Sequence, residues 1–183
     1  MNKAYGMGVT SSSTENLFLN RFHLEVEQGS EDLMTSCADA THFSYMSGKV
    51  EITNSLIEYS HDDALNLKHG YWYNLDSGSS QKRTFTLSKI TTTMPLPQEG
   101  DKIAVYNKMT FEGHGTYTVV SATEESGKFI VTVKERIANL NAWGECRVTF
   151  LSHTPKFVFR NNIVRNKRNR GILVQVPNAI IEN

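Results

Sequence analysis

Residues 48–67, GKVEITNSLIEYSHDDALNL, and residues 155–174, PKFVFRNNIVRNKRNRGILV, align without a gap at an offset of 107 positions (155 − 48). Apolar side chains coincide along the two segments, which indicates an internal structural repeat. The coinciding pairs are Val50 with Phe157, Ile52 with Phe159, Leu56 with Ile163, Ile57 with Val164, Leu65 with Ile172 and Leu67 with Val174. Apolar positions two residues apart are typical of β-strands.

A second, shorter offset defines the repeating unit. The segment PKFVFRN at 155–161 aligns with PNAIIEN at 177–183, an offset of 22 positions (177 − 155). Such a unit is too short for helix-pair repeats, and its leucines are too sparse for a leucine-rich repeat. The segments are rich in Val, Ile, Phe and Thr, which favour strands. We therefore predict an all-β fold, a right-handed parallel β-helix (a solenoid) with coils of about 22 residues.

An asparagine recurs at the same place in these units, as Asn54, Asn161 and Asn183. Amide side chains that stack in register can bond to one another from coil to coil. Ordinary turn asparagines are the alternative, but the shared register favours a stacked amide ladder.

The larger offset exceeds one coil by 85 residues (107 − 22), and this excess lies between roughly residues 71 and 153. It contains the β-rich segments RTFTLSKITTT, DKIAVYNKMTF, GTYTVVSAT, KFIVTVKER and CRVTFLS. Short strands separated by turn residues predict a small inserted barrel or a compact sandwich. The predicted domains are solenoid coils at 1–73, a β-barrel module at 74–152 and further solenoid coils at 153–183.

The composition excludes several classes of protein. The formal net charge is 0, which argues against a nucleic-acid partner, because phosphate neutralisation needs a basic excess. No apolar run is long enough to span a membrane. The two cysteines, Cys37 and Cys146, are too few for a disulfide scaffold and are expected to be unpaired.

The chemistry concentrates in ADATHF at 38–43 and HDDALN at 61–66. Asp39 and Asp62 are 23 residues apart (62 − 39), about one coil. Because successive coils stack about 4.8 Å apart, Asp39 is expected almost directly below Asp62 and Asp63. Clustered carboxylates repel one another and raise the pKa of at least one member, so they usually indicate a metal site or acid–base chemistry.

The offset of 107 places Asn169 over Asp62 and Arg170 over Asp63. An arginine beside Asp63 favours a charged carboxylate, which suits a base better than an acid. Two-carboxylate chemistry is typical of glycoside hydrolysis. Asp62 and Asp63 face opposite ways in a regular strand, so both can serve one site only at a bend.

Plainer interpretations stay open. An Asp-Asp pair is commonly a solvated turn, and the histidines are more often structural than functional. Residues 71–73, YWY, fit a sugar-stacking platform or a hydrophobic seal equally well, and the basic run at 165–170 is expected to be a solvated or site-lining edge. Calcium binding is conceivable, although no recognised calcium motif is present.

Several motifs together resemble glycoside hydrolase family 110, the bacterial α-1,3-galactosidases that act on blood-group-B-type and related galactosides. They are GMGV at 6–9, ADATHF at 38–43, GKVEITNSLIE at 48–58, HDDALNL at 61–67 and FRNNIVRNKRNRGILVQVPNAIIEN at 159–183. The resemblance implies a β-helix that carries a β-barrel insertion. It also implies an inverting exo-hydrolase of galactose-terminated glycans that needs no metal or other cofactor.

By motif match, the resemblance makes Asp39, Asp62 and Asp63 the catalytic group. Asp62 and Asp63 are expected to activate water, and Asp39 to act as the acid or to bind galactose. Glu99, Glu112 or a carboxylate outside this chain are alternative acids. The candidate sugar-binding residues are His42, Asn66, Trp72, Arg168, Arg170 and Gln175.

Enzymes of this family are several times longer, so the chain is expected to be a fragment of a secreted or periplasmic protein. A solenoid cut between coils leaves open strand edges, so we expect self-association, such as a homo-oligomer, and a fragment that can be inactive alone.

Two other functions remain: a non-catalytic glycan-binding solenoid of the phage tail-fibre or adhesin type, and a polysaccharide lyase of the same fold. The carboxylate cluster favours the hydrolase, and a lyase would want calcium and a basic residue.

Overall fold

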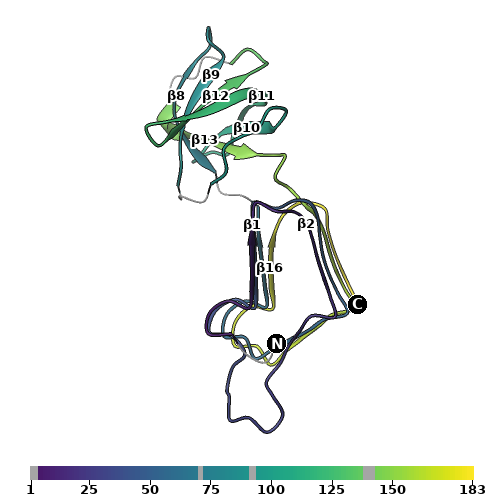
Figure 1. Ribbon diagram of the computed structural model, residues 1–183. Helices are drawn as coiled ribbons and strands as arrows, with labels where there is room; N and C mark the ends of the chain where they lie inside the picture. Colours follow the sequence, from purple (N-terminus) through teal and green to yellow (C-terminus); the bar gives the residue numbers. More distant parts are fainter. Residues whose placement is uncertain (1–3, 70–71, 91–93, 138–142) are drawn as a thin grey trace. The chain divides into compact units, whose positions relative to one another are not determined.

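The computed structural model describes residues 4–69, 72–90, 94–137 and 143–183 (Figure 1). Within these residues the chain is built from β-strands, apart from one short 3-10 turn, η1 (Trp143–Glu145). It divides into two compact units, Met1–His69 with His153–Asn183 and Gly70–Ser152. We call the first the parallel unit and the second the barrel. Over the described residues we find no helix with the length and apolar character needed to cross a membrane.

The parallel unit consists of three parallel sheets that the chain visits in turn. The first sheet contains β1 (Val9–Ser12), β4 (Thr41–Ser44), β7 (Leu65–Lys68) and β16 (Ile172–Gln175). The second contains β2 (Glu15–Asn20), β5 (Ser47–Thr53), β14 (Lys156–Arg160) and β17 (Ala179–Glu182). The third contains β3 (His23–Leu24), β6 (Leu56–Glu58) and β15 (Ile163–Arg165). The strands of each sheet lie stacked in Figure 1, an arrangement compatible with the predicted β-helix.

The strand register confirms the predicted offset of 107. All six apolar pairs named from the sequence are directly paired residues, from Val50 with Phe157 on β5 and β14 to Leu67 with Val174 on β7 and β16. The step of 22 also recurs, because Phe157 pairs with Ala179 (179 − 157).

The coil length is not constant, however. Thr41 pairs with Leu65, a step of 24 (65 − 41), and His23 pairs with Leu56, a step of 33 (56 − 23). The longer step arises because residues 25–35 form a loop without strands between β3 and β4.

Side chains that point inward from successive coils pack on one another to form the core of the parallel unit. Burying a side chain of this kind contributes about 1.5–3 kcal/mol, so the matched apolar rows account for the stacking. The central cluster contains Phe43, Met46, Val50, Ile52, Leu65, Leu67, Phe157 and Phe159.

The predicted amide ladder is confirmed between Asn54 and Asn161. Asn161 Nδ2 donates to Asn54 Oδ1 at 3.5 Å, and Asn54 Nδ2 donates to Asn20 Oδ1 at 2.9 Å. Both Asn54 and Asn161 have left-handed backbones, with φ of 53° and 54°, a conformation that asparagine tolerates better than most residues. Asn20 was not predicted as a member. For Asn183 we see no amide bond to this ladder among the described residues.

The second unit is a closed antiparallel barrel with the strand order β10-β11-β12-β9-β8-β13. Large apolar side chains, such as Tyr73, Phe85 and Phe129, fill it. The five segments predicted as strands are β9–β13, whereas β8 was not predicted. The strands are β8 (Tyr73–Ser79), β9 (Thr84–Ser88), β10 (Lys102–Asn107), β11 (Gly113–Glu125), β12 (Lys128–Val133) and β13 (Cys146–Phe150).

Neither cysteine forms a disulfide among the described residues, as predicted. Cys37 is exposed in the parallel unit, and Cys146 is buried in the barrel.

Candidate active site

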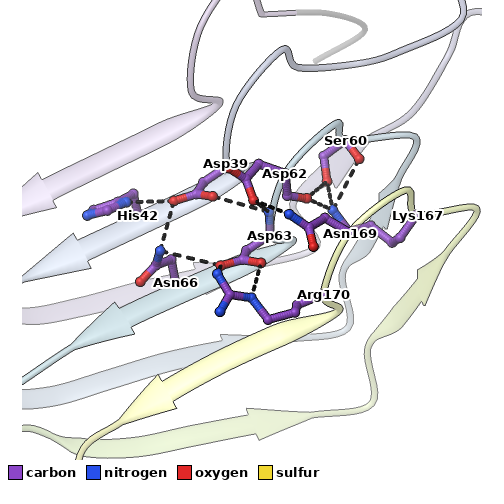
Figure 2. Close-up of polar contacts among 9 residues, drawn as sticks. All are labelled: Asp39, His42, Ser60, Asp62, Asp63, Asn66, Lys167, Asn169 and Arg170. Atoms are coloured by element: carbon purple, nitrogen blue, oxygen red, sulfur yellow. Dashed lines mark hydrogen bonds and ion pairs between the residues drawn. The ribbon is translucent and has the colours of Figure 1, made fainter.

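The candidate site lies where three neighbouring strands of the first sheet begin. Asp39 precedes β4, the pair Asp62 and Asp63 precedes β7, and Arg170 precedes β16. Because these strands stack in the order β4-β7-β16, residues far apart in the sequence meet at one corner, as Figure 2 shows. The predicted stacking of Asn169 on Asp62 is confirmed by a hydrogen bond of 2.9 Å from Asn169 Nδ2 to Asp62 Oδ1.

The chain bends at residues 61–64, immediately before β7. This bend is the feature that allows Asp62 and Asp63 to face the same patch, where a regular strand would separate them. One carboxylate oxygen from each of Asp39, Asp62 and Asp63 lies within 4.8 Å of the others. The backbone N–H of Asp63 connects the group, donating to Asp39 Oδ1 at 3.1 Å and to Asp62 Oδ1 at 3.0 Å.

Asp63 is fully buried and bound by Arg170. The guanidinium donates from Nε to Asp63 Oδ1 at 3.0 Å and from Nη2 to Oδ2 at 3.1 Å. Such a two-point contact fixes the carboxylate in one orientation. The hydrogen bond with Asp63 is also the main cause of the raised pKa of Arg170. The predicted placement of Arg170 over Asp63 is therefore confirmed.

Asp39 is buried as well, with 5% of its surface exposed, and three groups donate to it or contact it. His42 Nδ1 lies 2.6 Å from Asp39 Oδ2, and Asn66 Nδ2 donates to the same oxygen at 3.1 Å. The third is the N–H of Asp63. Asn66 Nδ2 also lies 3.4 Å from Asp63 Oδ2, so one amide group bridges two carboxylates. Both carboxylate oxygens of Asp39 are therefore engaged in contacts with neighbouring groups.

Asp62 differs from its two neighbours because it is only partly buried. Its Oδ1 accepts from Asn169 and from the N–H of Asp63. Its Oδ2 has no hydrogen bond to any other residue in the part of the chain that the structure describes. Both oxygens of Asp39 and both of Asp63 accept hydrogen bonds, so Asp62 Oδ2 is the oxygen of the cluster available for a ligand.

Lys167 joins the site, although sequence reasoning missed it. Its Nζ donates to the carbonyl oxygen of Ser60 at 3.2 Å, and it also contacts Ser60 Oγ and the carbonyl oxygen of Asp62. Burial lowers the pKa of Lys167, while Asp63, Asp62 and Asp39 oppose that shift. The offset of 107 could have revealed its position over Ser60, but not a contact with main-chain carbonyl groups.

The structure brings together His42, Asn66 and Arg170 with the three aspartates, but not every predicted residue. Arg168 Nη1 lies 3.1 Å from His61 Nε2, and we find no bond from it to an aspartate among the described residues. Gln175 is exposed at the end of β16. Trp72 belongs to the barrel, where the Arg147 guanidinium lies 4.5 Å from the centre of its ring. Tyr71 lies outside the described residues.

The three carboxylates have the spacing to hold a cation. Most of their oxygens already accept hydrogen bonds, and two cationic side chains, Arg170 and Lys167, approach the cluster. The charge is therefore partly balanced without an ion. The prediction that no metal takes part stays a prediction.

No protein-family model matches the chain. Curated proteins do match it over nearly its whole length, and their names agree with the resemblance predicted from the motifs. The chain is 31% identical to an alpha-1,3-galactosidase B of Akkermansia muciniphila, over 99% of this chain and 23% of that protein. It is 29% identical to an alpha-1,3-galactosidase B of Phocaeicola vulgatus, over 98% of this chain and 32% of that protein.

An alpha-1,3-galactosidase A of Streptomyces avermitilis is also 29% identical, over 99% of this chain and 31% of that protein. The predicted resemblance to the α-1,3-galactosidases is thus confirmed along the chain. The chain spans between 23% and 32% of the length of these relatives.

Proposed function

We propose that this homologue of the α-1,3-galactosidases is part of a glycosidase that removes terminal α-1,3-linked galactose from glycans. The observation that carries the proposal is the cluster of three aspartates, with Arg170 bound to one member and one oxygen of Asp62 left available. The names of the relatives, at about 30% identity, supply the substrate class.

The fold proposed for this activity is a right-handed parallel β-helix, interrupted by an inserted barrel between its coils. The parallel pairing at an offset of 107 supports this, since the strands on either side of the barrel segment are neighbours in the same sheets. The module boundaries 1–73, 74–152 and 153–183 remain part of the proposal.

Asp62 is the group we assign to activating the water molecule. It is the most exposed of the three carboxylates, and its Oδ2 has no hydrogen bond to the described residues. Asp63 is fully buried and held by Arg170, so its role is to support the charge and position of Asp62. Both residues thus act on the water-activating side of the reaction, as the family resemblance implies.

The general acid lies outside this cluster in our proposal. Inverting glycosidases keep acid and base roughly 6.5–9.5 Å apart to leave room for water. Asp39, Asp62 and Asp63 approach within 4.8 Å, which is too close for such a pair. Asp39 also accepts hydrogen bonds on both oxygens, which suits a structural or galactose-binding role better than the acid role. Glu99, Glu112 or a carboxylate elsewhere in a longer protein remain the candidates.

Sugar hydroxyl groups have suitable partners beside the cluster. The Arg170 side chain is 59% exposed although it binds Asp63, and the His42 side chain is 19% exposed although it contacts Asp39. Each can therefore reach a ligand while it stays oriented by a carboxylate. We retain Asn66, Trp72, Arg168 and Gln175 as weaker proposals for substrate contacts.

The direct test is release of galactose from an α-1,3-linked galactoside, with the anomer followed by NMR. We expect the parent chain, or the longer protein that contains it, to release β-galactose. A double variant, Asp62→Asn with Asp63→Asn, should release none. Asp32→Asn is a matched control, because Asp32 is an exposed carboxylate in the loop at 25–35. Release of α-galactose first, or equal activity in the double variant, would contradict the proposal.

A chelator separates the hydrolase from a lyase of the same fold. The hydrolase is expected to keep its activity in EDTA, whereas a calcium-dependent lyase would lose it and form an unsaturated product. We further propose that a longer protein containing this chain is secreted or periplasmic.

A further inference from the structure

Four consecutive side chains of one coil stand over four residues of the coil before it. Each pair in this column is 107 residues apart. The pairs are Lys167 with Ser60, Arg168 with His61, Asn169 with Asp62, and Arg170 with Asp63. Among the described residues, the bonds that join the other three pairs are between side chains. Lys167 also contacts main-chain carbonyl groups of the residues below it, and Figure 2 shows it with Ser60 and Asp62.

The main-chain contacts of Lys167 lie on both sides of one residue. Nζ reaches the carbonyl oxygens of Ser60 and Asp62, which flank His61, and it also reaches Ser60 Oγ. A lysine ammonium has three donors and no acceptor, so these three oxygens use its full capacity. The ammonium therefore connects the carbonyl groups on either side of His61, where the bend that sets the direction of Asp62 begins.

The charge of Lys167 acts on the same cluster. Burial alone favours the neutral amine and lowers its pKa, and the three aspartates favour the ammonium. The partly buried Lys167 amine therefore contacts the main chain beside the cluster and also interacts electrostatically with its three aspartates. The charged groups that act on its ammonium are Asp63, Asp62 and Asp39, named from the largest effect to the smallest.

We propose that Lys167 is a positioning residue of the active site. Its ammonium binds the carbonyl oxygens of Ser60 and Asp62 and holds Asp62 in the orientation needed to activate water. The catalytic consequence rests on the proposed galactosidase function, but the positioning itself does not.

The main test is therefore independent of activity. The main-chain amide and carbonyl signals of residues 60–63 are compared by NMR at one neutral pH in the parent, Lys167→Met, Lys167→Arg and the control Lys156→Met. Lys156 is an exposed lysine on β14, in a different sheet from the cluster. In Lys167→Met the carbonyl oxygens of Ser60 and Asp62 lose their ammonium donor, so the main-chain signals of residues 60–63 should shift. Lys167→Arg and the control should stay close to the parent.

Unchanged main-chain signals of residues 60–63 in folded Lys167→Met would overturn the proposal. Should that variant not fold, the unmodified protein supplies the answer through 15N NMR of its lysine ammonium groups. If all three ammonium protons of Lys167 are hydrogen-bonded, they exchange slowly with water and their signal persists at neutral pH. Loss of that signal through rapid exchange would also overturn the proposal.

In an active protein, the same variants add a kinetic readout. Lys167→Met should lower kcat by about 10- to 100-fold with little change in KM, the scale expected when a catalytic group is misplaced. Lys167→Arg should recover part of the loss. Absence of galactose release by the longer protein that contains this chain would contradict the proposed function while leaving the NMR result for Lys167 intact, so the two failures can be told apart.

Discussion

The parallel unit and the barrel are both made of short β-strands, but they join their strands in opposite ways. The barrel closes on itself through antiparallel pairs, including the hairpin where Glu125 pairs with Lys128. The parallel unit pairs residues up to 107 positions apart and leaves strands such as β1 and β17 at sheet edges. Parallel stacking repeats one position on the next coil, so like residues gather in columns. Such a column is how three aspartates come to share one corner.

The strongest test of this contrast is the loss of a single carboxylate in each unit. Asp62→Asn should lower kcat by about 10³-fold, within the range for removal of an acid–base group. Asp101→Asn, in the barrel, should leave kcat near the parent value. Galactose release at saturating substrate measures both, and a similar loss in the two variants would mean that the column of aspartates is not the centre of the chemistry.

Substitutions that create a cavity in the core of one unit should next show whether the two units unfold separately. Phe157→Ala in the parallel unit and Phe129→Ala in the barrel each remove a fully buried ring, so each should cost about 3–5 kcal/mol. Hydrogen exchange followed by mass spectrometry assigns the loss to a unit. We expect each variant to lose protection in its own unit, and equal losses in both units would show one cooperative fold.

The amide ladder offers a smaller comparison. Asn54→Ala loses ladder bonds and places alanine at a φ of 53°, so the free energy of unfolding should fall by about 1–2 kcal/mol. Ser126→Ala, at a φ of 51° in the β11–β12 turn of the barrel, changes a residue in the same conformation with no ladder. Urea unfolding measures the free energy of unfolding of both variants. An equal loss in Asn54→Ala and Ser126→Ala would mean that the ladder bonds do not stabilise the fold.

The smallest effect concerns pH. Burial, with the nearby His153, lowers the pKa of His69 below its ordinary value of 6.5. The unfolded chain then binds a proton that the folded chain resists, so this contribution to stability is present above the unfolded pKa and is lost as pH falls below it. His69→Gln should make the stability of the parallel unit less sensitive to acid between about pH 7 and 5, as thermal unfolding at several pH values would show.

The register of the parallel unit could be predicted because each inward position is apolar in both copies of the repeat. Val50 and Phe157 carry that signal without any knowledge of the turns. The coil length could not be fixed in the same way, since the loop at 25–35 adds residues without adding a strand. Strand β8 was missed because its sequence, YNLDSGS, is rich in residues that favour turns, and closure of the barrel imposes its pairing with β9 and β13.

The candidate site likewise has a part that the sequence predicts and a part that it does not. The column of Asn169 and Arg170 over Asp62 and Asp63 was predictable from the offset alone. The role of Lys167 was not, because its partners are carbonyl oxygens, which every residue carries. Side-chain direction decided the remaining cases, since Arg168 meets His61 and Gln175 is exposed.

The contact between His69 and Thr154 has an evolutionary consequence. Their side chains are 3.2 Å apart, although 85 positions separate them in the sequence. The segment between them thus leaves the parallel unit and returns to it at a single corner, without a shift in the register of the next coil. A whole module could therefore be gained, exchanged or lost at this corner while the stacked residues of the parallel unit stay in register.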